Sequence, residues 1–229
     1  MNKKNLDTKI KHLYFKQTVS RKENDIDRVS LAKREIETLE ILKEITNGDF
    51  LHENSSVLDL GCGDQFLKQE LQKKNIEYLG FDIQDLNLEY ESLPIKDNSQ
   101  DLIISLALIE HLYDPHNMLT ESLRCLKKGG TLVISTPNWL YSSKIFFNDY
   151  THVRPYTPKS LIHLINDIGF SNIYDFPNLR CKSRFAYTNR FRYFLANLRP
   201  LTSDFRFSYL LPSFLKGKSK GMFVLAKKI

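Results

Sequence analysis

From Ser55 onward, strand-length apolar runs alternate with helix-length amphipathic runs, and this alternation constrains the fold more than any other feature. The runs with helical spacing are Gln65 to Lys74 and Pro115 to Leu126. The strand-like runs are Val57 to Leu60, Glu77 to Asp82, Asp101 to Leu106 and Thr131 to Thr136, with a short apolar run near Leu88. Strands that alternate with helices pair in parallel, and the helices cover both faces of the sheet. The sequence therefore predicts a doubly wound, mostly parallel α/β fold.

The segments on either side of this alternating region extend it. Apolar residues at helical spacing among alternating charges predict a helix over Asp27 to Thr46, after a polar, lysine-rich arm. We expect residues 1–50 to form this arm and helix, a candidate lid, and residues 51–229 to form one catalytic domain. Residues 137–156 and 180–220 are its expected substrate-side insertions. Inside the domain, a helix is predicted to begin at Thr157-Pro158 and to end at Gly169. The other expected elements are a helix over Arg190 to Leu198 and a closing strand over Gly221 to Ala226.

The run V-L-D-L-G-C-G-D, from Val57 to Asp64, predicts a buried strand that ends in a tight glycine turn. Such a turn lets a ligand lie against bare backbone. Asp82 ends the next predicted strand, so both acids are expected at the carboxyl edge of the sheet, where doubly wound folds bind ligands. A nucleoside site is therefore predicted. Phe66 stands where dinucleotide-binding turns have their third glycine, which disfavours a nicotinamide dehydrogenase.

Five ordered segments between Asp27 and Phe170 resemble the class I S-adenosylmethionine-dependent methyltransferases, particularly the branch containing the ubiquinone and menaquinone biosynthesis enzymes. They are Val57 to Asp64, Asp82, Leu93 to Asp101 (L-P-I-K-D-N-S-Q-D), Ala107 to Pro115 (A-L-I-E-H-L-Y-D-P) and Leu126 to Leu132 (L-K-K-G-G-T-L). The resemblance implies a seven-stranded, Rossmann-like sheet, S-adenosylmethionine as cofactor and methyltransferase activity.

The same resemblance implies a cofactor role for ten residues. Those expected at the methionine end are Asp59, near the amino group, and Gly61, Cys62 and Gly63, in the turn. Those expected at the nucleoside end are Asp82 and Ile83, by the ribose, and Glu89 and Tyr90, by the adenine. Those expected to face the sulfonium are Ser105 and Leu106. A carboxylate such as Asp82 can accept hydrogen bonds from two ribose hydroxyls. For Glu89, an exposed loop acid without a ligand role is an equal alternative.

Two histidines are candidate catalytic bases at this edge of the sheet. His111 follows the strand that ends at Leu106, and His152 lies in the aromatic insertion. Methyl transfer is an in-line displacement that chiefly needs alignment, but a hydroxyl acceptor must also lose its proton. Histidine is the natural base near neutral pH. A purely structural role at a helix start is the alternative for His111.

The sequence predicts no metal site. In quinone O-methyltransferases of the resembled family, E-x-x-E-H after this strand is associated with magnesium. Glu110 and His111 match that pattern, but Ala107 replaces the first glutamate. A hard cation prefers several oxygen ligands, and this segment offers too few.

The acceptor is sought in the insertion and in the C-terminal region. The stretch D-Y-T-H-V-R-P-Y-T-P-K-S-L, from Asp149, resembles one in bacterial methyltransferases that accompany surface-polysaccharide biosynthesis, which favours a sugar hydroxyl. Net charge is +6, and Phe176 to Ile229 holds 12 Lys and Arg against one acid, Asp204. Arginines interleaved with phenylalanines favour an anionic substrate. They equally suit RNA bases, an anionic membrane carrying a lipid-linked glycan, or simple packing on the domain.

We therefore expect an S-adenosylmethionine-dependent O-methyltransferase acting on a small molecule or a glycan or lipid-linked precursor. The alternatives are an RNA-binding or RNA-modifying methyltransferase and a quinone-precursor methyltransferase. Transient contact with an anionic membrane is a further expectation, and nucleic acid is a less favoured partner. The charged N-terminus lacks a signal-peptide core, the apolar runs are shorter than the roughly 20 residues of a membrane-spanning helix, and the three cysteines are scattered. These features predict a soluble, cytoplasmic protein.

Overall fold

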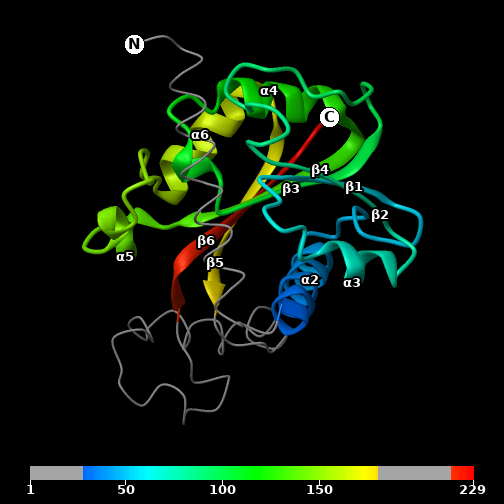
Figure 1. Cartoon of the computed structure of the whole chain (residues 1–229), viewed down its shortest axis with the longest axis horizontal. Helices are drawn as coiled ribbons and strands as arrows, with labels where there is room; N and C mark the ends of the chain where they lie inside the picture. Colours follow the sequence, from blue (N-terminus) through cyan, green and yellow to red (C-terminus); the bar gives the residue numbers. More distant parts are fainter. Residues whose placement is uncertain (1–27, 180–217) are drawn as a thin grey trace.

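The computed structural model describes residues 28–179 and 218–229, which form a three-layered α/β fold (Figure 1). A six-stranded sheet has the order β2-β1-β3-β4-β6-β5. Its parallel part consists of β1 (Ser56–Leu60), β2 (Glu77–Phe81), β3 (Gln100–Leu106) and β4 (Leu126–Pro137). The last two strands, β5 (Ser171–Leu179) and β6 (Lys218–Lys227), are antiparallel to each other, and β6 is antiparallel to β4. The predicted doubly wound, mostly parallel fold is confirmed.

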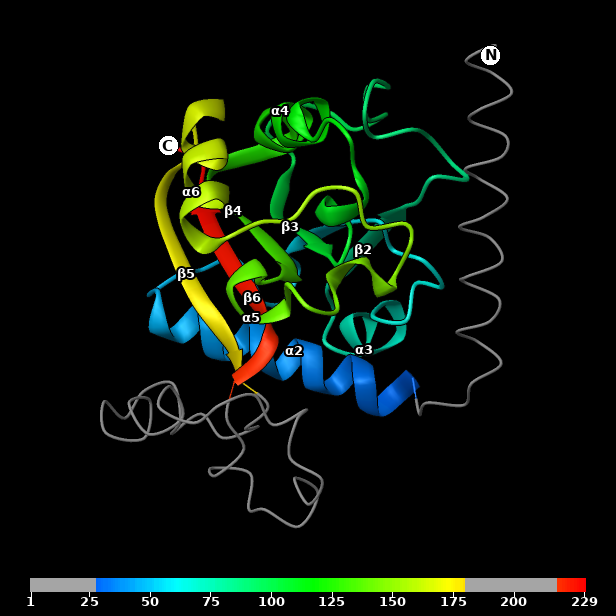
Figure 2. The same cartoon turned by 90° about the vertical axis from the view of Figure 1, so that its left-hand side faces the viewer.

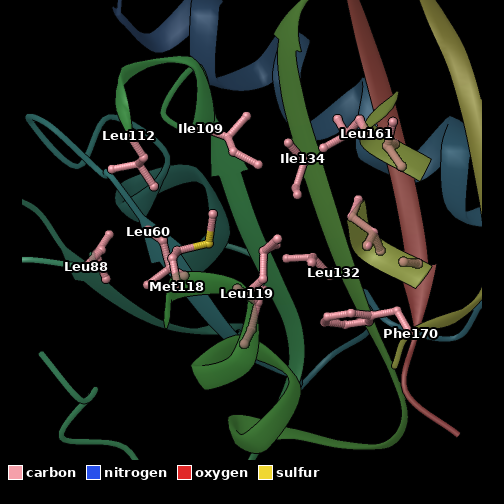
Figure 3. Packing of buried hydrophobic residues seen from close by; sticks show 14 of the residues in the cluster. Leu60, Leu88, Ile109, Leu112, Met118, Leu119, Leu132, Ile134, Leu161 and Phe170 are labelled. Carbon is pink, nitrogen blue, oxygen red and sulfur yellow. The ribbon is translucent and has the colours of Figure 1, made fainter. Parts of the chain in front are cut away.

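Helices cover both faces of the sheet (Figures 1 and 2). The side chains of alternate strand residues point to opposite faces, so each face has its own apolar cluster. On one face, α4 (His116–Cys125) and α6 (Pro158–Ile168) pack against residues such as Leu132 and Ile134 (Figure 3). On the other, α2 (Arg28–Ile45) and α3 (Lys68–Gln72) pack against Val57, Leu102 and Val133. Among the described residues, no helix is both long and apolar enough to cross a membrane.

Local signals in the sequence predict several elements accurately. The helix expected over Asp27 to Thr46 is α2. In α6, Thr157 accepts a hydrogen bond from the Ser160 backbone, Pro158 takes the first helical position, and Gly169 ends the helix at φ 112°. The strand expected over Gly221 to Ala226 lies within β6. The helix expected over Arg190 to Leu198 lies outside the described residues.

One expectation is corrected, and the implied number of strands is not confirmed. The helix expected from Gln65 to Lys74 is only Lys68–Gln72, because the turn after β1 continues through Gln65, whose φ is +56°. The resemblance implied seven strands, but the described residues form six. Near Leu88, Asp85 and Asn87 accept hydrogen bonds from the backbone amides of Asp82 and Glu89, so the chain turns locally there instead of joining the sheet.

The insertion after β4 begins at the carboxyl end of that strand and contacts the segment that follows β3. It contains α5 (Trp139–Ser142) and the 3₁₀ turn η2 (Phe146–Asn148), and Asn138 forms a bridge with Tyr156 at its base. A second 3₁₀ turn, η1 (Ile109–His111), follows β3 at the same edge. The two segments therefore meet above the sheet, where doubly wound folds bind ligands.

Candidate functional site

The turns after β1 and β2 are joined by hydrogen bonds at the carboxyl edge of the sheet. The Gly61 amide donates to the Phe81 carbonyl at 2.8 Å, and the Gly63 amide donates to Asp82 Oδ2 at 2.8 Å. The other carboxylate oxygen of Asp82 accepts from the Ile83 amide at 2.7 Å. Asp82 thus lies beside the glycine turn, as the sequence predicted for residues at the ends of neighbouring strands.

The two glycines of this turn serve different purposes. A Cβ placed on Gly61 would lie 2.9 Å from the Leu108 side chain, so this position must stay bare for the turn to pack against the segment before η1. A Cβ placed on Gly63 would meet nothing within 4 Å, although φ there is +54°. Close packing therefore ends at Gly63, and open space lies beside this residue, whose amide donates to the Asp82 carboxylate.

Asp59 is buried at the end of β1, only 2% exposed, and accepts a hydrogen bond of 2.8 Å from the Tyr78 hydroxyl. Burial raises the pKa of Asp59 to about 7, with a smaller rise from Asp82, against the lowering effect of the Tyr78 hydrogen bond. Tyr78 was not singled out from the sequence, although its place in the strand beside Asp59 is a usable signal. This pair makes the protonation of Asp59 sensitive to its surroundings near neutral pH.

Cys62 turns its side chain away from the open side of the turn. Its thiol is buried, and a Cβ on Gly80 would come within 2.8 Å of the sulfur. Burial, together with Asp59, raises the pKa of the thiol to about 12, so the thiol is neutral at physiological pH. Only the backbone of Cys62 is therefore expected to contact a ligand in this turn, and its thiol is not a reactive group of the site.

The residues expected near the adenine belong to the loop that follows β2. Glu89 Oε1 accepts a hydrogen bond of 2.9 Å from the Asp114 amide, which ties this loop to the segment after η1. Tyr90 is 43% exposed. Glu89 is thus a partly buried, hydrogen-bonded acid rather than a fully solvated one.

The residues expected near the sulfonium end β3. Ser105 is fully buried, and its hydroxyl has no hydrogen-bond partner among the described residues. Leu106 is partly buried against the apolar cluster under α2. A buried hydroxyl of this kind is costly unless something supplies a partner.

The two predicted histidines lie side by side, although they are 41 residues apart. Their ring centroids are 4.7 Å apart in an edge-on arrangement. His152 Nδ1 lies 2.7 Å from the Phe146 carbonyl, and His111 Nδ1 lies 3.0 Å from the Thr151 hydroxyl. The backbone carbonyl of Glu110 accepts from the amides of residues 153 and 154 at 2.9 and 3.1 Å, which fastens the insertion to η1.

Two acids complete this histidine cluster. Glu110 is 1% exposed and accepts a hydrogen bond of 2.9 Å from the Thr136 hydroxyl. Asp149 Oδ2 lies 3.8 Å from His152 Nε2, and its Oδ1 accepts from the Thr151 hydroxyl at 2.6 Å. Burial would raise the pKa of Asp149, but the Thr151 hydrogen bonds and the histidines outweigh it and hold the pKa below its usual value. Asp149 was not singled out from the sequence, although it lies only three residues before His152.

One wall of the cluster is aromatic. The Phe146 ring lies 4.6 Å from the His152 ring, and Trp139 and Phe147 both pack edge-on against Phe146. Several large apolar side chains of the same insertion are exposed, namely Leu140, Tyr141, Ile145, Phe147 and Tyr150. The insertion thus presents an apolar surface beside a polar cluster.

Comparison with known proteins identifies the family. Residues 32–174 match the model of a family described as a methyltransferase domain. A probable S-adenosylmethionine-dependent methyltransferase of Mycolicibacterium smegmatis is 26% identical over 132 residues, which cover 50% of this chain and 51% of the relative. A ubiquinone biosynthesis O-methyltransferase of Acinetobacter baylyi is 26% identical over 111 residues, which cover 39% of this chain and 47% of the relative. The chain spans about half the length of these curated relatives.

Solved structures share the fold. An S-adenosylmethionine-dependent methyltransferase from Archaeoglobus fulgidus superimposes with a TM-score of 0.55 at 22% identity, over 85% of this chain and 94% of the other. A phosphoethanolamine N-methyltransferase from Haemonchus contortus, solved with S-adenosylhomocysteine, gives a TM-score of 0.53 at 16% identity. The match covers 83% of this chain and 52% of the other. At these identities the likeness concerns the fold alone.

Proposed function

Because this chain belongs to the methyltransferase-domain family and has the class I fold of S-adenosylmethionine-dependent methyltransferases, we propose that it transfers a methyl group from S-adenosylmethionine to a hydroxyl oxygen. The acceptor is a small molecule or a glycan or lipid-linked precursor. One observation carries the donor half of this proposal, namely the hydrogen bond between Gly63 and Asp82 with open space beside it.

The residues at this edge fit the donor. The bare backbone at Gly63 leaves room for a ligand, and Asp82 offers carboxylate oxygens for the ribose hydroxyls. Asp59 offers a carboxylate for the donor's ammonium group, and the buried Ser105 hydroxyl is a polar atom without a partner among the described residues. Bound S-adenosylmethionine supplies an electrophilic methyl carbon on a cationic sulfur. The protein's part is to align the acceptor with that carbon and to exclude water.

The histidine cluster is the acceptor side of the proposed site. Gly61 packs against Leu108, so the donor turn lies next to the segment that leads into His111. In the reaction, the acceptor oxygen forms a bond to the methyl carbon as the carbon–sulfur bond breaks, S-adenosylhomocysteine leaves, and the hydroxyl proton passes to a base in the histidine cluster. His111 and His152 activate that hydroxyl. The relative named as an O-methyltransferase supports oxygen as the acceptor atom.

A quinone precursor is a second candidate acceptor, favoured by the apolar surface of the insertion and by the name of the Acinetobacter relative. The same surface supports transient contact with an anionic membrane, whose interface suits aromatic side chains. The alternative of an RNA substrate depends on the basic tail, and residues 180–217 of that tail lie outside the described residues.

Calorimetry with S-adenosylhomocysteine tests the donor site. Asp82→Ala removes the carboxylate expected to accept the ribose hydroxyls, which should weaken binding about 30-fold, on the order of 2 kcal/mol. Asp167→Ala, which removes an exposed acid on α6, is the matched control and should bind normally. Unchanged affinity in Asp82→Ala would contradict the assignment of this edge.

A screen with labelled donor against nucleotide sugars, lipid-linked sugars, quinol precursors and RNA identifies the acceptor class. With the acceptor in hand, His152→Ala should keep its affinity for S-adenosylhomocysteine and lose turnover. Full turnover in this variant would remove His152 from the proposed mechanism.

A further inference from the structure

We propose that Glu110, His111 and His152 bind a divalent cation of the zinc class. Each residue offers one ligand atom, and these three atoms lie within 4.8 Å of one another. Two imidazoles and one carboxylate form a common donor set for zinc and related transition metals, whereas magnesium and calcium prefer oxygen ligands. This inference rests on the proposed function and deepens it, since it states how the histidines activate the acceptor.

The fold assembles this site from two segments that the sequence keeps apart. Glu110 and His111 belong to η1 and alone supply two donors. The insertion brings the third, because the carbonyl of Glu110 accepts hydrogen bonds from the amides of Val153 and Arg154, directly after His152. The expectation of no metal counted the carboxylate missing at Ala107. The structure places an imidazole from the insertion beside the two residues that remain.

The second layer around these residues also suits a metal site. Histidine ligands usually hold their other ring nitrogen on a carbonyl or carboxylate, which fixes the ring and its tautomer. The Nδ1 of His152 lies 2.7 Å from the Phe146 carbonyl, so Nε2 is the nitrogen that would bind a cation, with Asp149 Oδ2 3.8 Å from it. His111 is held by Thr151, and the Glu110 carboxylate is held by the Thr136 hydroxyl. All three proposed ligands are thus oriented from outside the cluster.

Distance and charge are compatible with binding. Zinc–ligand bonds of about 2.0–2.1 Å place tetrahedral ligand atoms about 3.4 Å apart, so the three side chains need to close by about 1.4 Å at most. A dication at this site would be held by the Glu110 carboxylate and would lie near the Asp149 carboxylate, which is 3.8 Å from His152 Nε2. The guanidinium of Arg154 donates to the Tyr113 carbonyl. Three protein ligands leave a position for an oxygen of the acceptor, whose hydroxyl pKa a cation would lower.

The test uses the full chain, freed of metal with EDTA and then titrated with Co²⁺ as a spectroscopic probe and with Zn²⁺ in a calorimeter. Wild type should bind one cation per chain and show the visible absorption of tetrahedrally coordinated cobalt, and Mg²⁺ should not compete. His111→Ala and His152→Ala should each bind at least about 100-fold more weakly. His163→Ala, which removes an exposed histidine on α6, should bind as wild type does.

Glu110→Gln tests the carboxylate, and its unfolding temperature shows whether the buried site tolerates the change. If Glu110→Gln does not fold, cobalt binding by His111→Ala and His152→Ala tests the site instead. Equal cobalt binding in wild type and both histidine variants, or no binding at all, would overturn the metal site.

Binding of S-adenosylhomocysteine, measured in the same metal-free samples, separates the two proposals. Retained binding without a cobalt signal would overturn the metal site and leave the methyltransferase proposal standing. A cobalt signal that depends on His152, without S-adenosylhomocysteine binding, would support the metal site and contradict the proposed function. Turnover at the wild-type rate in protein shown to be metal-free would contradict a role for the cation in activating the acceptor.

Discussion

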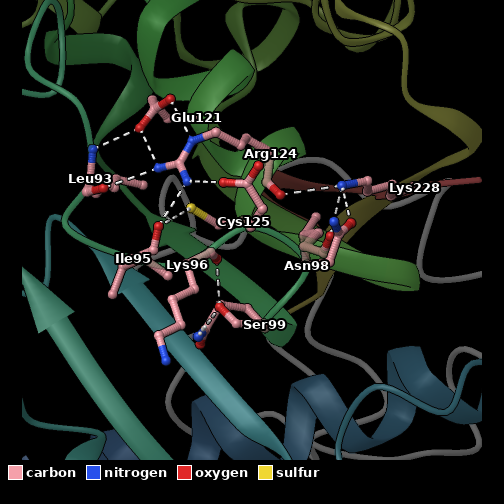
Figure 4. A network of polar contacts seen from close by, with 12 residues as sticks. Leu93, Ile95, Lys96, Asn98, Ser99, Glu121, Arg124, Cys125 and Lys228 are labelled. Carbon is pink, nitrogen blue, oxygen red and sulfur yellow. Dashed lines mark hydrogen bonds and ion pairs between the residues drawn. The ribbon is translucent and has the colours of Figure 1, made fainter.

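The two ends of β3 and β4 carry two different polar clusters. At the end where both strands begin, Arg124 donates to Glu121, to Asp97 and to the carbonyls of Leu93 and Ile95 (Figure 4). At the end where both strands finish, Glu110, His111 and His152 converge. Each cluster contains a buried glutamate, but the Arg124 cluster pairs it with a cation, whereas the histidine cluster surrounds it with a hydroxyl and two imidazoles.

This difference distinguishes a structural cluster from the cluster that we propose binds a ligand. Hydrogen bonds from Arg124 hold the pKa of Glu121 below its usual value, so the charges of that cluster are matched within the protein. The network also ties the loop over residues 93–99 to α4, which is a stabilising role. In the histidine cluster, the side chains share an ability to donate lone pairs, and such a set is completed by a cation or a proton. We therefore expect the cluster where the strands begin to contribute to stability and the cluster where they finish to contribute to binding.

The largest expected effect comes from breaking the Arg124 cluster. Arg124→Met leaves Glu121 buried without its cation, which should cost about 3 kcal/mol and lower the melting temperature by roughly 10 °C. Affinity for S-adenosylhomocysteine, measured well below the transition, should not change. The exposed Arg34→Met, whose side chain is 50% exposed, should stay within about 0.5 kcal/mol of wild type. A large loss of affinity for S-adenosylhomocysteine in Arg124→Met would contradict the proposal that the Arg124 cluster contributes only to stability.

A smaller effect is expected from pH at the ligand-binding end. Because burial raises the pKa of Asp59 to about 7, the carboxyl is mostly neutral at pH 6 and mostly ionised at pH 8. An ionised Asp59 is needed to accept the ammonium group of the donor, so calorimetry should give about tenfold tighter binding of S-adenosylhomocysteine at pH 8 than at pH 6. Asp59→Asn should bind weakly and lose this dependence.

Stability should change in the opposite direction over the same range. In the unfolded chain Asp59 ionises near the ordinary value for an aspartate, a pKa of 3.8. The folded protein therefore holds more protons between that value and about 7, and the contribution of Asp59 to the free energy of unfolding falls as pH rises through this window. Urea unfolding of wild type and Asp59→Asn across this range measures the contribution. If the free energy of unfolding changed equally with pH in the two proteins, the expected contribution of Asp59 would be contradicted.

The smallest effect is expected from Lys228 at the structural end. Its ammonium donates to the Asn98 side chain and to the carbonyls of Arg124 and Leu126. Lys228→Met should cost about 1 kcal/mol in thermal unfolding, with ligand affinity unchanged. Lys159→Met, an exposed substitution on α6, is the control. A loss as large as that of Arg124→Met would show that the network depends on both cations equally.

The sequence predicted best those features that are encoded within a few residues. Thr157-Pro158 and Gly169 mark both ends of α6 because capping is a local interaction. The placement of Asp82 beside the glycine turn followed from the parallel order of the strands. β5, by contrast, was not predicted, since Pro177 and the polar residues around it weaken the strand pattern.

The cluster of His111 and His152 needed the fold. Both residues were singled out, but their contact depends on hydrogen bonds between η1 and the insertion, which no local pattern encodes. The role of Tyr78 was missed for the same reason, because its hydroxyl donates to Asp59, a residue that tertiary structure brings near. The motif position at Ala107 offers no carboxylate, and the sequence alone does not show that the fold places His152 beside Glu110 and His111.

The contact between Gly61 and Leu108 gives the site a built-in linkage. A ligand that moves the glycine turn must also move the segment leading to His111, because no space separates them. Donor and acceptor are therefore expected to bind cooperatively, and the factor by which one changes the affinity of the other must be the same in both directions. With such a linkage, each reactant binds more tightly when the other is already bound.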